Sequence, residues 1–308
     1  MGKIAFLFSG QGAQTVGMMK DIYENSAAAK VIFEEADRIL GRGISALCFD
    51  GPQEELNLTH NTQPCMLAAE LAADAALKEF GVKPDAVAGF SLGEYAALTA
   101  AGTISTEDVF RVIQIRADAM QDACPVGKGG MAAITKQTPE AVQALCNEAE
   151  GYVVPVNYNC PGQIVVSGEA DAVDQVCALA KSRKIRAIKL SVSVPSHCAL
   201  MAPAADKLAE VFRTVTFQVP AIPCYSDVDA LPYKPDADIA AQLCQQVQSP
   251  VLWEQTLRNM YADGIRTFVE IGPGSTLTSF VKKTLEDVEM YSINSWEALN
   301  SFCQTCSR

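Results

Sequence analysis

The sequence is poor in basic residues, histidines and long hydrophobic runs. It holds 24 Lys and Arg against 36 Asp and Glu, a formal net charge of -12, which argues against binding to nucleic acid or to an anionic membrane. No segment approaches the ~18 consecutive apolar residues of a membrane span. The start of the chain has one Lys and a short apolar run, so it resembles neither a signal peptide nor a transit peptide, and we expect a cytoplasmic protein.

Groups of residues that could hold a metal are also missing. Only two histidines accompany the 11 scattered cysteines, several of which lie in apolar helical patterns typical of buried thiols in a reducing compartment. The single Cys-x-x-Cys pair, Cys303 and Cys306, lacks the further ligands that zinc requires. We therefore expect no metal site.

The 308 residues, 49% of them hydrophobic, leave room for one large domain and a smaller one. A short apolar run at 3–8 predicts a buried strand, and a helical stretch follows at 17–40. The segment Gln63–Phe80 predicts a helix, Asp85–Phe90 a strand, and Glu94–Ala101 a helix that Gly102 ends. This alternation predicts an α/β domain with a mostly parallel sheet covered on both faces.

The Gln63–Phe80 helix is apolar almost all round. Glu70, Asp74 and Lys78, at a spacing of four, form its only polar stripe, so we expect a nearly buried helix with one narrow solvent-exposed edge. Later in the chain, the pattern predicts a single helix near 236–262.

A different order of elements occupies 127–194. The order is βαββαβ, which predicts a ferredoxin-like small domain inserted into the large one. The large domain then comprises 1–126 and 195–308. The expected elements are a strand at 130–134, a helix at 138–150, strands at 152–157 and 163–167, a helix at 171–183 and a strand at 186–192.

The motif Gly89-Phe-Ser-Leu-Gly93 lies between a predicted strand and a predicted helix. In that context the serine occupies a strained turn that only small neighbours tolerate, beside the free N–H groups of a helix amino terminus. Ser91 is therefore the candidate nucleophile, and an ordinary Gly-rich turn is the alternative. A serine needs a base within hydrogen-bond reach. His197 follows the last strand of the inserted unit, at a domain junction that favours a cleft; His60 fits a loop or capping position.

Six ordered motifs between about residues 4 and 294 resemble malonyl-CoA:acyl carrier protein transacylases. The motifs are Gly10–Gln14, Gly89–Tyr95, Ile115–Met120, Asn157–Gln163, Val194–His197 and Glu270–Gly274. The resemblance implies a large hydrolase-like α/β domain with a ferredoxin-like insertion, in agreement with the pattern above. It also implies a coenzyme A thioester as substrate, no permanently bound cofactor, and acyl carrier protein as partner.

The resemblance also implies roles for individual residues. Ser91 would accept the malonyl group and His197 would activate it. The backbone N–H groups of Gln11 and Leu92 would form the oxyanion hole. The backbone carbonyl of Gln246 would orient the imidazole, a role that would not depend on the Gln side chain.

Arg116 lies in the helical pattern Val109–Cys124, with Met120 one turn further on the same face. Spacing alone leaves a surface ion pair with Asp118 or Asp122 open. The resemblance favours pairing with the free carboxylate of malonate, which a guanidinium can bind through two parallel hydrogen bonds.

One position departs from the family, which commonly has His where this chain has Phe90. We expect a more apolar acyl pocket, with an effect on substituted malonates. The neighbouring Leu92 agrees with the malonyl-selective members.

An acidic carrier protein needs a positive surface on this acidic chain. The densest basic run is the expected docking surface, and a solvated helix end is the alternative. Its residues are Lys181, Arg183, Lys184, Arg186 and Lys189.

The sequence therefore predicts a ping-pong malonyltransferase of fatty acid biosynthesis. A trans-acting polyketide acyltransferase and an acyl-thioester hydrolase are alternatives on the same fold. A non-catalytic module that docks a carrier protein is the alternative from another class.

Overall fold

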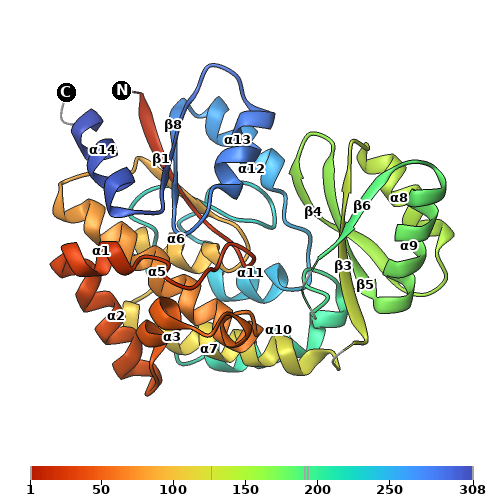
Figure 1. Ribbon diagram of the computed structural model, residues 1–308, viewed down its shortest axis with the longest axis horizontal. Helices are drawn as coiled ribbons and strands as arrows, with labels where there is room; N and C mark the ends of the chain where they lie inside the picture. Colours follow the sequence, from red (N-terminus) through yellow and green to blue (C-terminus); the bar gives the residue numbers. More distant parts are fainter. Residues whose placement is uncertain (1, 126, 191, 193, 307–308) are drawn as a thin grey trace.

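Two β-sheets and the helices around them make up the fold (Figure 1). The computed structural model describes residues 2–125, 127–190, 192 and 194–306. The strands are β1 Lys3–Phe8, β2 Ala86–Gly89, β3 Gly129–Thr135, β4 Val153–Cys160, β5 Gln163–Glu169, β6 Arg186–Lys189, β7 Cys224–Tyr225, β8 Ile265–Ile271 and β9 Glu289–Ile293. The helices are α1 Lys20–Asn25, α2 Ala27–Leu40, α3 Ile44–Asp50, α4 Gln53–Leu56, α5 Thr59–Glu79, α6 Gly93–Ala100, α7 Thr106–Ala123, α8 Pro139–Glu148, α9 Ala170–Ser182, α10 Ala202–Phe212, α11 Ile239–Gln246, α12 Trp253–Ala262, α13 Thr276–Thr284 and α14 Trp296–Cys306, with a 3₁₀ turn at Ala199–Met201.

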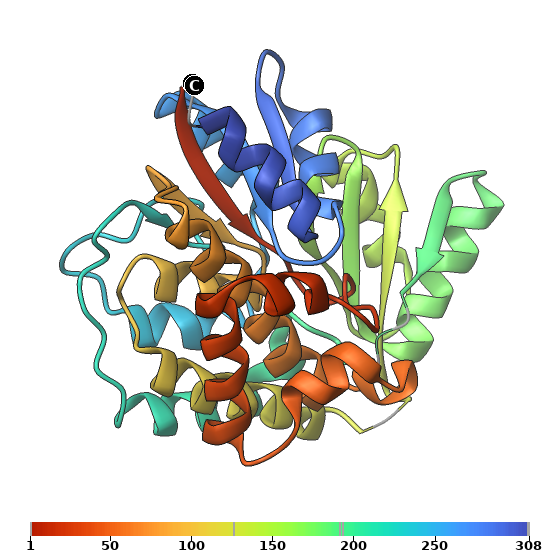
Figure 2. The ribbon, with the colours of Figure 1, turned by 60° about the vertical axis from the view of Figure 1, so that its left-hand side comes forward.

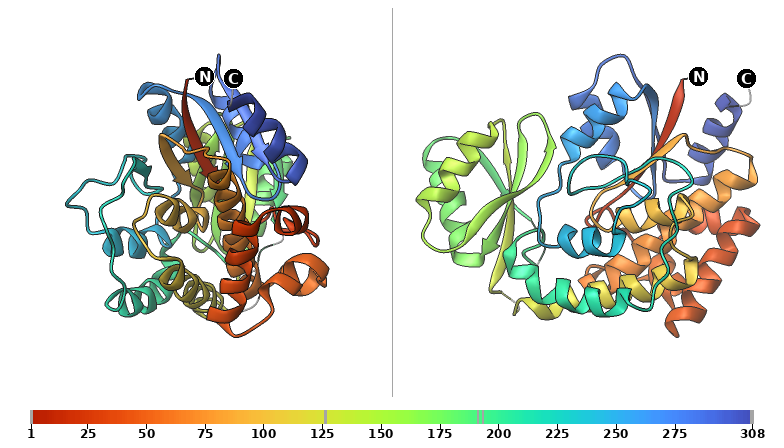
Figure 3. Two further views of the ribbon diagram at one scale, coloured as in Figure 1. Left: turned by 90° about the vertical axis from the view of Figure 1, so that its left-hand side faces the viewer. Right: turned by 180° about the vertical axis from the view of Figure 1, so that it is seen from behind.

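The larger sheet is parallel, with strand order β7-β2-β1-β8-β9. Its central strand β1 alternates between two hydrophobic clusters. Phe6 and Phe8 pack with residues of α2, α5, α6 and α7, whereas Ala5 and Leu7 pack with residues of α12 and α13. Helices therefore cover both faces of this sheet, as the sequence predicted for a mostly parallel sheet (Figure 3).

The smaller sheet is antiparallel, with order β4-β5-β3-β6. Its helices α8 and α9 pack on one face, where Ala132 and Ile134 of β3 meet Val142 and Val173. It lies to one side of the parallel sheet and is coloured green in Figures 1 and 2. The last strand, expected to reach 192, ends at Lys189; Ser191 lies outside the described residues.

One segment of the larger unit adds to the edge of the smaller sheet. Val251 forms a bridge with Asn157 of β4. Its carbonyl accepts the N–H of Tyr158 at 3.0 Å, and its own N–H donates to the carbonyl of Val156 at 2.8 Å. The two sheets are thus joined by backbone hydrogen bonds as well as by the connecting chain.

The prediction of a solvent-exposed edge on the long apolar helix is wrong. Helix α5 packs against α2, α6 and α7, and this surrounds the stripe that was expected to face water. Glu70 is fully buried and Asp74 is 3% exposed. Asp74 pairs with Lys78 at 2.5 Å. Burial, and then the nearby Glu270, raise the pKa of Glu70 well above its usual value, so we infer that Glu70 is buried as a neutral acid.

Two of the expected helices are each divided. The stretch at 17–40 forms α1 and α2, because Ser26 between them caps α2 by accepting the N–H of Ala29 at 3.0 Å. The stretch at 236–262 forms α11 and α12. Pro250 has no N–H to close a helical bond to the carbonyl of Gln246, so the first helix ends there.

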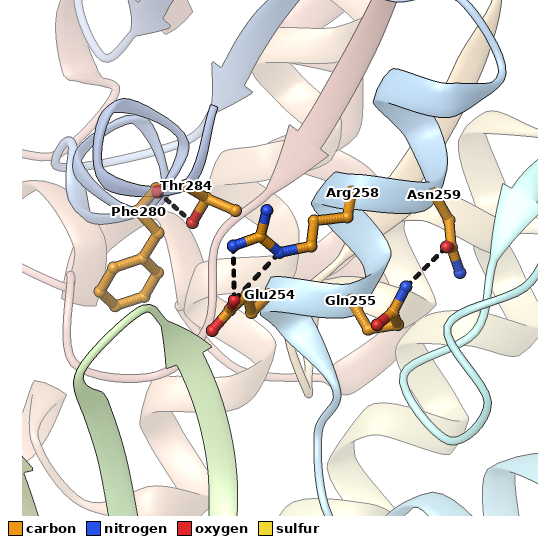
Figure 4. A network of polar contacts seen from close by, with 6 residues as sticks. All are labelled: Glu254, Gln255, Arg258, Asn259, Phe280 and Thr284. Carbon is orange, nitrogen blue, oxygen red and sulfur yellow. Dashed lines mark hydrogen bonds and ion pairs between the residues drawn. The ribbon is translucent and has the colours of Figure 1, made fainter. Parts of the chain in front are cut away.

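Helix α12 satisfies its outer side chains within itself (Figure 4). Arg258 donates to Glu254 through Nε at 3.0 Å and through its terminal nitrogen at 2.8 Å, and Gln255 donates to Asn259 at 2.8 Å. Phe280 of α13 points instead toward the β4–β5 hairpin and lines a cavity there. Leu277 and Phe280 of α13 therefore contribute apolar surface to this cavity.

Replacing Gly89 by Ala should unfold the turn after β2. A Cβ at Gly89 would lie 1.9 Å from the carbonyl oxygen of Gly93, so we expect Gly89→Ala to lose more than about 3 kcal/mol of unfolding free energy in urea. Gly81 is the control: its φ is +74° but no heavy atom lies within 4 Å, so Gly81→Ala should lose about 1–2 kcal/mol. Equal losses would contradict this account of the turn.

Candidate active site

Ser91 lies at the turn between β2 and α6, where the carboxyl end of a central strand meets a helix. Its φ is +57°, in the left-handed region, which is uncommon for a residue with a side chain. Gly93 makes the turn possible, since a Cβ there would lie 2.3 Å from the carbonyl oxygen of Phe8. The serine side chain is thereby directed into a pocket.

His197 lies against this hydroxyl. Its Nε2 is 2.8 Å from Ser91 Oγ, and its Nδ1 is 2.9 Å from the carbonyl oxygen of Gln246. Because a carbonyl only accepts hydrogen bonds, Nδ1 carries the proton and Nε2 offers its lone pair to the serine. The structure thus brings together Ser91, His197 and the Gln246 carbonyl, which the sequence placed in one site.

The protonation state of His197 suits a base. Its side chain is buried, and burial lowers the pKa of His197 to about 4, helped by the positive charge of Arg116 and opposed by hydrogen bonds to the carbonyls of Gln246 and Ser249. The imidazole is therefore neutral at pH 7 and free to accept a proton.

Arg116 is a buried cation surrounded by neutral partners. It is 1% exposed and donates to Gln63 Oε1 at 2.6 Å, to Gln246 Oε1 at 3.1 Å and to Ser91 Oγ at 3.2 Å. Its Nε has no partner among the described residues, and the guanidinium lies 5.3 Å from the ring centroid of Tyr95.

The alternative of a surface ion pair for Arg116 does not hold. Asp122 pairs with Lys207 at 3.1 Å, and Asp118 accepts from Gln114 at 3.0 Å. Within the described part of the chain no carboxylate forms an ion pair with Arg116. The buried guanidinium beside Ser91, the candidate nucleophile, is thus left able to bind an anion.

The two residues expected to supply the oxyanion hole lie in this pocket. Gln11 and Leu92 line the same pocket as Ser91 and His197. Among the described residues, neither N–H donates a hydrogen bond. The loop that carries Gln11 is anchored by its side chain, which donates to Thr59 Oγ1 at 3.3 Å. Preorganised donors of this kind stabilise charge that develops in a transition state.

Phe90 and Met120 line the pocket as expected. The Phe90 ring packs edge-on against Trp253, with centroids 5.5 Å apart, and lies 6.4 Å from Phe280. The Met120 sulfur accepts from the Gln63 amide at 3.5 Å. The wall on the Phe90 side is therefore apolar.

A second cavity, of about 240 Å³, adjoins the first and shares Gln11, Phe90 and Asn157 with it. Asn157 and Asn159 in its lining are 7% and 5% exposed. Their side-chain oxygens have no hydrogen-bond partner in the described part of the molecule. Two side chains in this lining are thus buried with an unused acceptor.

The basic run lies apart from this site, on α9, the following turn and β6. Arg183 forms an ion pair with Glu148, and Lys189 with Asp174. Lys181, Lys184 and Arg186 form no ion pair with any described residue. The run is therefore divided between paired and unpaired cations.

Sequence reasoning missed four contributions to the site. Gln63 and the side chain of Gln246 hold Arg116, and Glu94 and Asp227 lie behind Ser91. Asp227 follows β7, and residues after the carboxyl ends of parallel strands gather at one sheet edge, so its position was a usable signal. Gln63 gave a weaker signal, as a polar residue at the start of an apolar helix.

Residues 5–297 match the model of the acyl transferase domain family. The chain belongs to this family. The malonyl CoA-acyl carrier protein transacylase of Bacillus subtilis (strain 168) is 43% identical, over 99% of this chain and 98% of that protein. The enzyme of the same name from Escherichia coli (strain K12) is 41% identical, over 97% and 98%.

Solved structures of acyl transferases share the fold. An acyl carrier protein S-malonyltransferase from Vibrio cholerae superposes with a TM-score of 0.93 at 41% identity, covering 97% of this chain and 99% of that one. A malonyl-transacylase in complex with a type II PKS acyl-carrier protein gives 0.95 at 38% identity, covering 98% and 99%. No helix in the described ranges is both long and apolar enough to cross a bilayer.

The imidazole of His197 should stay neutral down to acid pH. With a pKa of about 4, its proton NMR resonances should not shift between pH 8 and about pH 5 and should move only below that. The chain has two histidines. The spectrum of His60→Gln, in which His197 alone remains, therefore identifies the His197 resonances. A His197 titration near the ordinary value of about 6.5 would contradict the burial effect.

Proposed function

We propose that this chain transfers a malonyl group from coenzyme A to the thiol of an acyl carrier protein, through a malonyl ester on Ser91. The names of its relatives support this activity. The main observation behind it is the position of Arg116. Its guanidinium is buried, has no carboxylate partner among the described residues, and donates to Ser91 Oγ at 3.2 Å.

In the first half-reaction, His197 Nε2 takes the proton of Ser91 as Oγ attacks the thioester carbonyl. The N–H groups of Gln11 and Leu92 hold the resulting oxyanion. When the intermediate collapses, the C–S bond breaks and the imidazolium returns its proton to the departing coenzyme A thiolate.

The second half-reaction runs the same steps in reverse with a new thiol. The carrier thiol gives its proton to His197 and attacks the ester carbonyl of malonyl-Ser91. The C–O bond then breaks, and the protonated imidazole returns its proton to the serine oxygen.

Arg116 selects the acyl group. The free carboxylate of malonate is one methylene from the thioester carbonyl, and the guanidinium lies beside the attacking oxygen, so a short diacyl group can reach both. A neutral acyl chain would forgo the two charge-assisted hydrogen bonds that the guanidinium can make to a carboxylate. The same cation disfavours the hydrolase alternative for neutral acyl thioesters.

The coenzyme A thioester enters as a substrate, and the proposal needs no resident cofactor. Its pantetheine portion carries two amide N–H groups. Asn157 and Asn159 line the cavity that adjoins the Ser91 pocket. Their side-chain oxygens are buried without a partner, and in this proposal the two side chains turn to accept hydrogen bonds from these groups.

The larger unit, which we assign to 1–126 and 195–308, is hydrolase-like, and the smaller, at 127–194, is ferredoxin-like. The βαββαβ order and the antiparallel order β4-β5-β3-β6 support the second assignment. The boundary residue Val126 lies outside the described residues.

The carrier protein docks, in this proposal, on the basic run Lys181, Arg183, Lys184, Arg186 and Lys189. Lys184 and Arg186 line a hollow of about 500 Å³ together with Lys136 and Lys283. None of these four forms an ion pair within the described chain, so the surface stays positive for an acidic partner. Arg183 and Lys189, which are paired, contribute less.

Intact mass measured after brief mixing with malonyl-CoA should show a malonyl adduct, and Ser91→Ala should show none. Arg116→Ala should lose roughly 100- to 1,000-fold in kcat/KM for malonyl-CoA, the rate equivalent of about 3–4 kcal/mol. It should lose much less for acetyl-CoA, which has no carboxylate to bind.

Arg111 provides the matched control, since it is an exposed arginine on the same helix, paired with Glu107. Arg111→Ala should leave both rates unchanged. A Ser91→Ala protein that still supports transfer would refute the mechanism. An adduct that water removes as fast as carrier protein does would favour the hydrolase alternative.

Charge reversal at Lys184 and Arg186 should slow the second half-reaction only. We expect the double variant Lys184→Glu, Arg186→Glu to raise KM for the carrier protein about tenfold or more at low salt, with acylation by malonyl-CoA unchanged. Lys30→Glu, on the distant helix α2, is the control. Equal losses in both half-reactions would reject the docking surface.

A further inference from the structure

Two buried carboxyl groups lie behind Ser91, outside the residues that line its pocket. Glu94 is fully buried and Asp227 is 2% exposed. Asp227 Oδ2 accepts the backbone N–H of Ser91 at 2.6 Å. This bond fixes the left-handed turn of the nucleophile from a part of the chain 136 residues away.

A single amide joins the two carboxyl groups. The Gln246 Nε2 donates to Glu94 Oε2 at 2.6 Å and to the Ser91 carbonyl at 2.7 Å, and lies 3.4 Å from Asp227 Oδ2. On its other oxygen, Glu94 accepts the Tyr233 hydroxyl at 2.5 Å and the Asp227 N–H at 3.4 Å. Glu94 and Asp227 thus belong to one buried hydrogen-bonded group.

The charged and titratable groups that face this pair are few. They are Arg116, Tyr95, Tyr233, Cys224 and, beyond Arg116, His197. Arg116 is the one cation among these neighbours. Burial raises the pKa of each of the three uncharged acids, so their protons stay in place at neutral pH.

The charge balance therefore allows one negative charge but not two. One ionised carboxyl offsets the Arg116 guanidinium, whereas a second would be buried without a counter-charge. Burial raises the pKa of Glu94 to about 7, and burial together with Glu94 raises that of Asp227 well above its usual value. Two groups coupled in this way lose their protons as a unit.

We propose that Glu94 and Asp227 share one proton, and that this proton controls how strongly Arg116 holds the carboxylate of the incoming acyl group. The inference rests on the proposed malonyl transfer. Neither carboxyl group reaches the pocket, so both are positioning residues that act through Arg116 and through the backbone of Ser91.

The sign of the effect follows from the charges. Below the apparent pKa of the pair, one negative charge balances Arg116, and the acyl carboxylate meets a neutral group. Above it, a second negative charge lies behind the guanidinium and opposes binding. Affinity for malonyl-CoA should therefore fall as pH rises, on the order of tenfold across the titration.

Asp227→Asn separates this effect from simple support of the turn. The Asn oxygen can still accept the Ser91 N–H, but one carboxyl group alone remains and stays ionised against Arg116. We expect KM for malonyl-CoA to rise about tenfold in the unaltered protein between about pH 6 and about pH 8.5, and to stay level in Asp227→Asn. In both proteins kcat should follow the same profile.

Two further variants complete the test. Asp118→Asn removes an exposed carboxyl group from the helix that carries Arg116 and should keep the rise in KM. Glu94→Gln removes the other member of the pair and should also level KM, so the test does not depend on Asp227→Asn folding; thermal melts report folding for each.

A rise in KM that persists in Asp227→Asn or in Glu94→Gln would overturn the proposal, as would a level KM in the unaltered protein. These outcomes differ from a failure of the proposed function. In that case the unaltered protein would form no malonyl-Ser91 adduct at any pH, and both proposals would fall together.

Discussion

Burial of the Arg116 guanidinium beside the Ser91 hydroxyl is the constraint around which the site is arranged. A cation at 1% exposure must be compensated, because its isolated charge would cost far more than folding can supply. The chain compensates it with amide oxygens and an aromatic ring at close range, and with carboxyl groups one layer behind. The charge of Arg116 is thereby balanced, and the side of the guanidinium that faces Ser91 stays open.

The end of α11 connects this charge balance to the base. The Gln246 backbone orients His197, while its side chain contacts Arg116, Glu94 and Ser91. The resemblance assigned a role to its carbonyl, and the contacts of its side chain are a further finding of the structure. Pro250 has no N–H to form the helical bond to that carbonyl, which accepts the Ser249 N–H at 3.4 Å and still contacts the imidazole.

The parallel sheet and the order of the small unit could be predicted from local patterns, as could the positions of Ser91 and His197. Apolar periodicity indicates the strands and helices, and a motif between a strand and a helix indicates the position of Ser91. The partners of Arg116 could not, because Gln63 and Gln246 are 183 residues apart in the chain and meet only in the folded core.

The failed expectations have related causes. Periodicity counts polar residues but does not show what packs over them, so Glu70 and Asp74 were placed in water. The pattern over 236–262 likewise predicted one helix, although the helix breaks before Pro250. The docking role of the basic run stays a prediction. Its charge density is visible in the sequence, whereas the pairing of Arg183 and Lys189 with Glu148 and Asp174, which lie outside the run, is not.

The bridge between Val251 and β4 gives the site a mechanical property. Only four residues lie between Gln246 and Val251, a length that spans less than about 20 Å even when extended. One end of this tether is fastened to the edge of the small sheet and the other holds the imidazole. The orientation of the imidazole is therefore coupled, through one short stretch of chain, to the placement of the small sheet beside the large one.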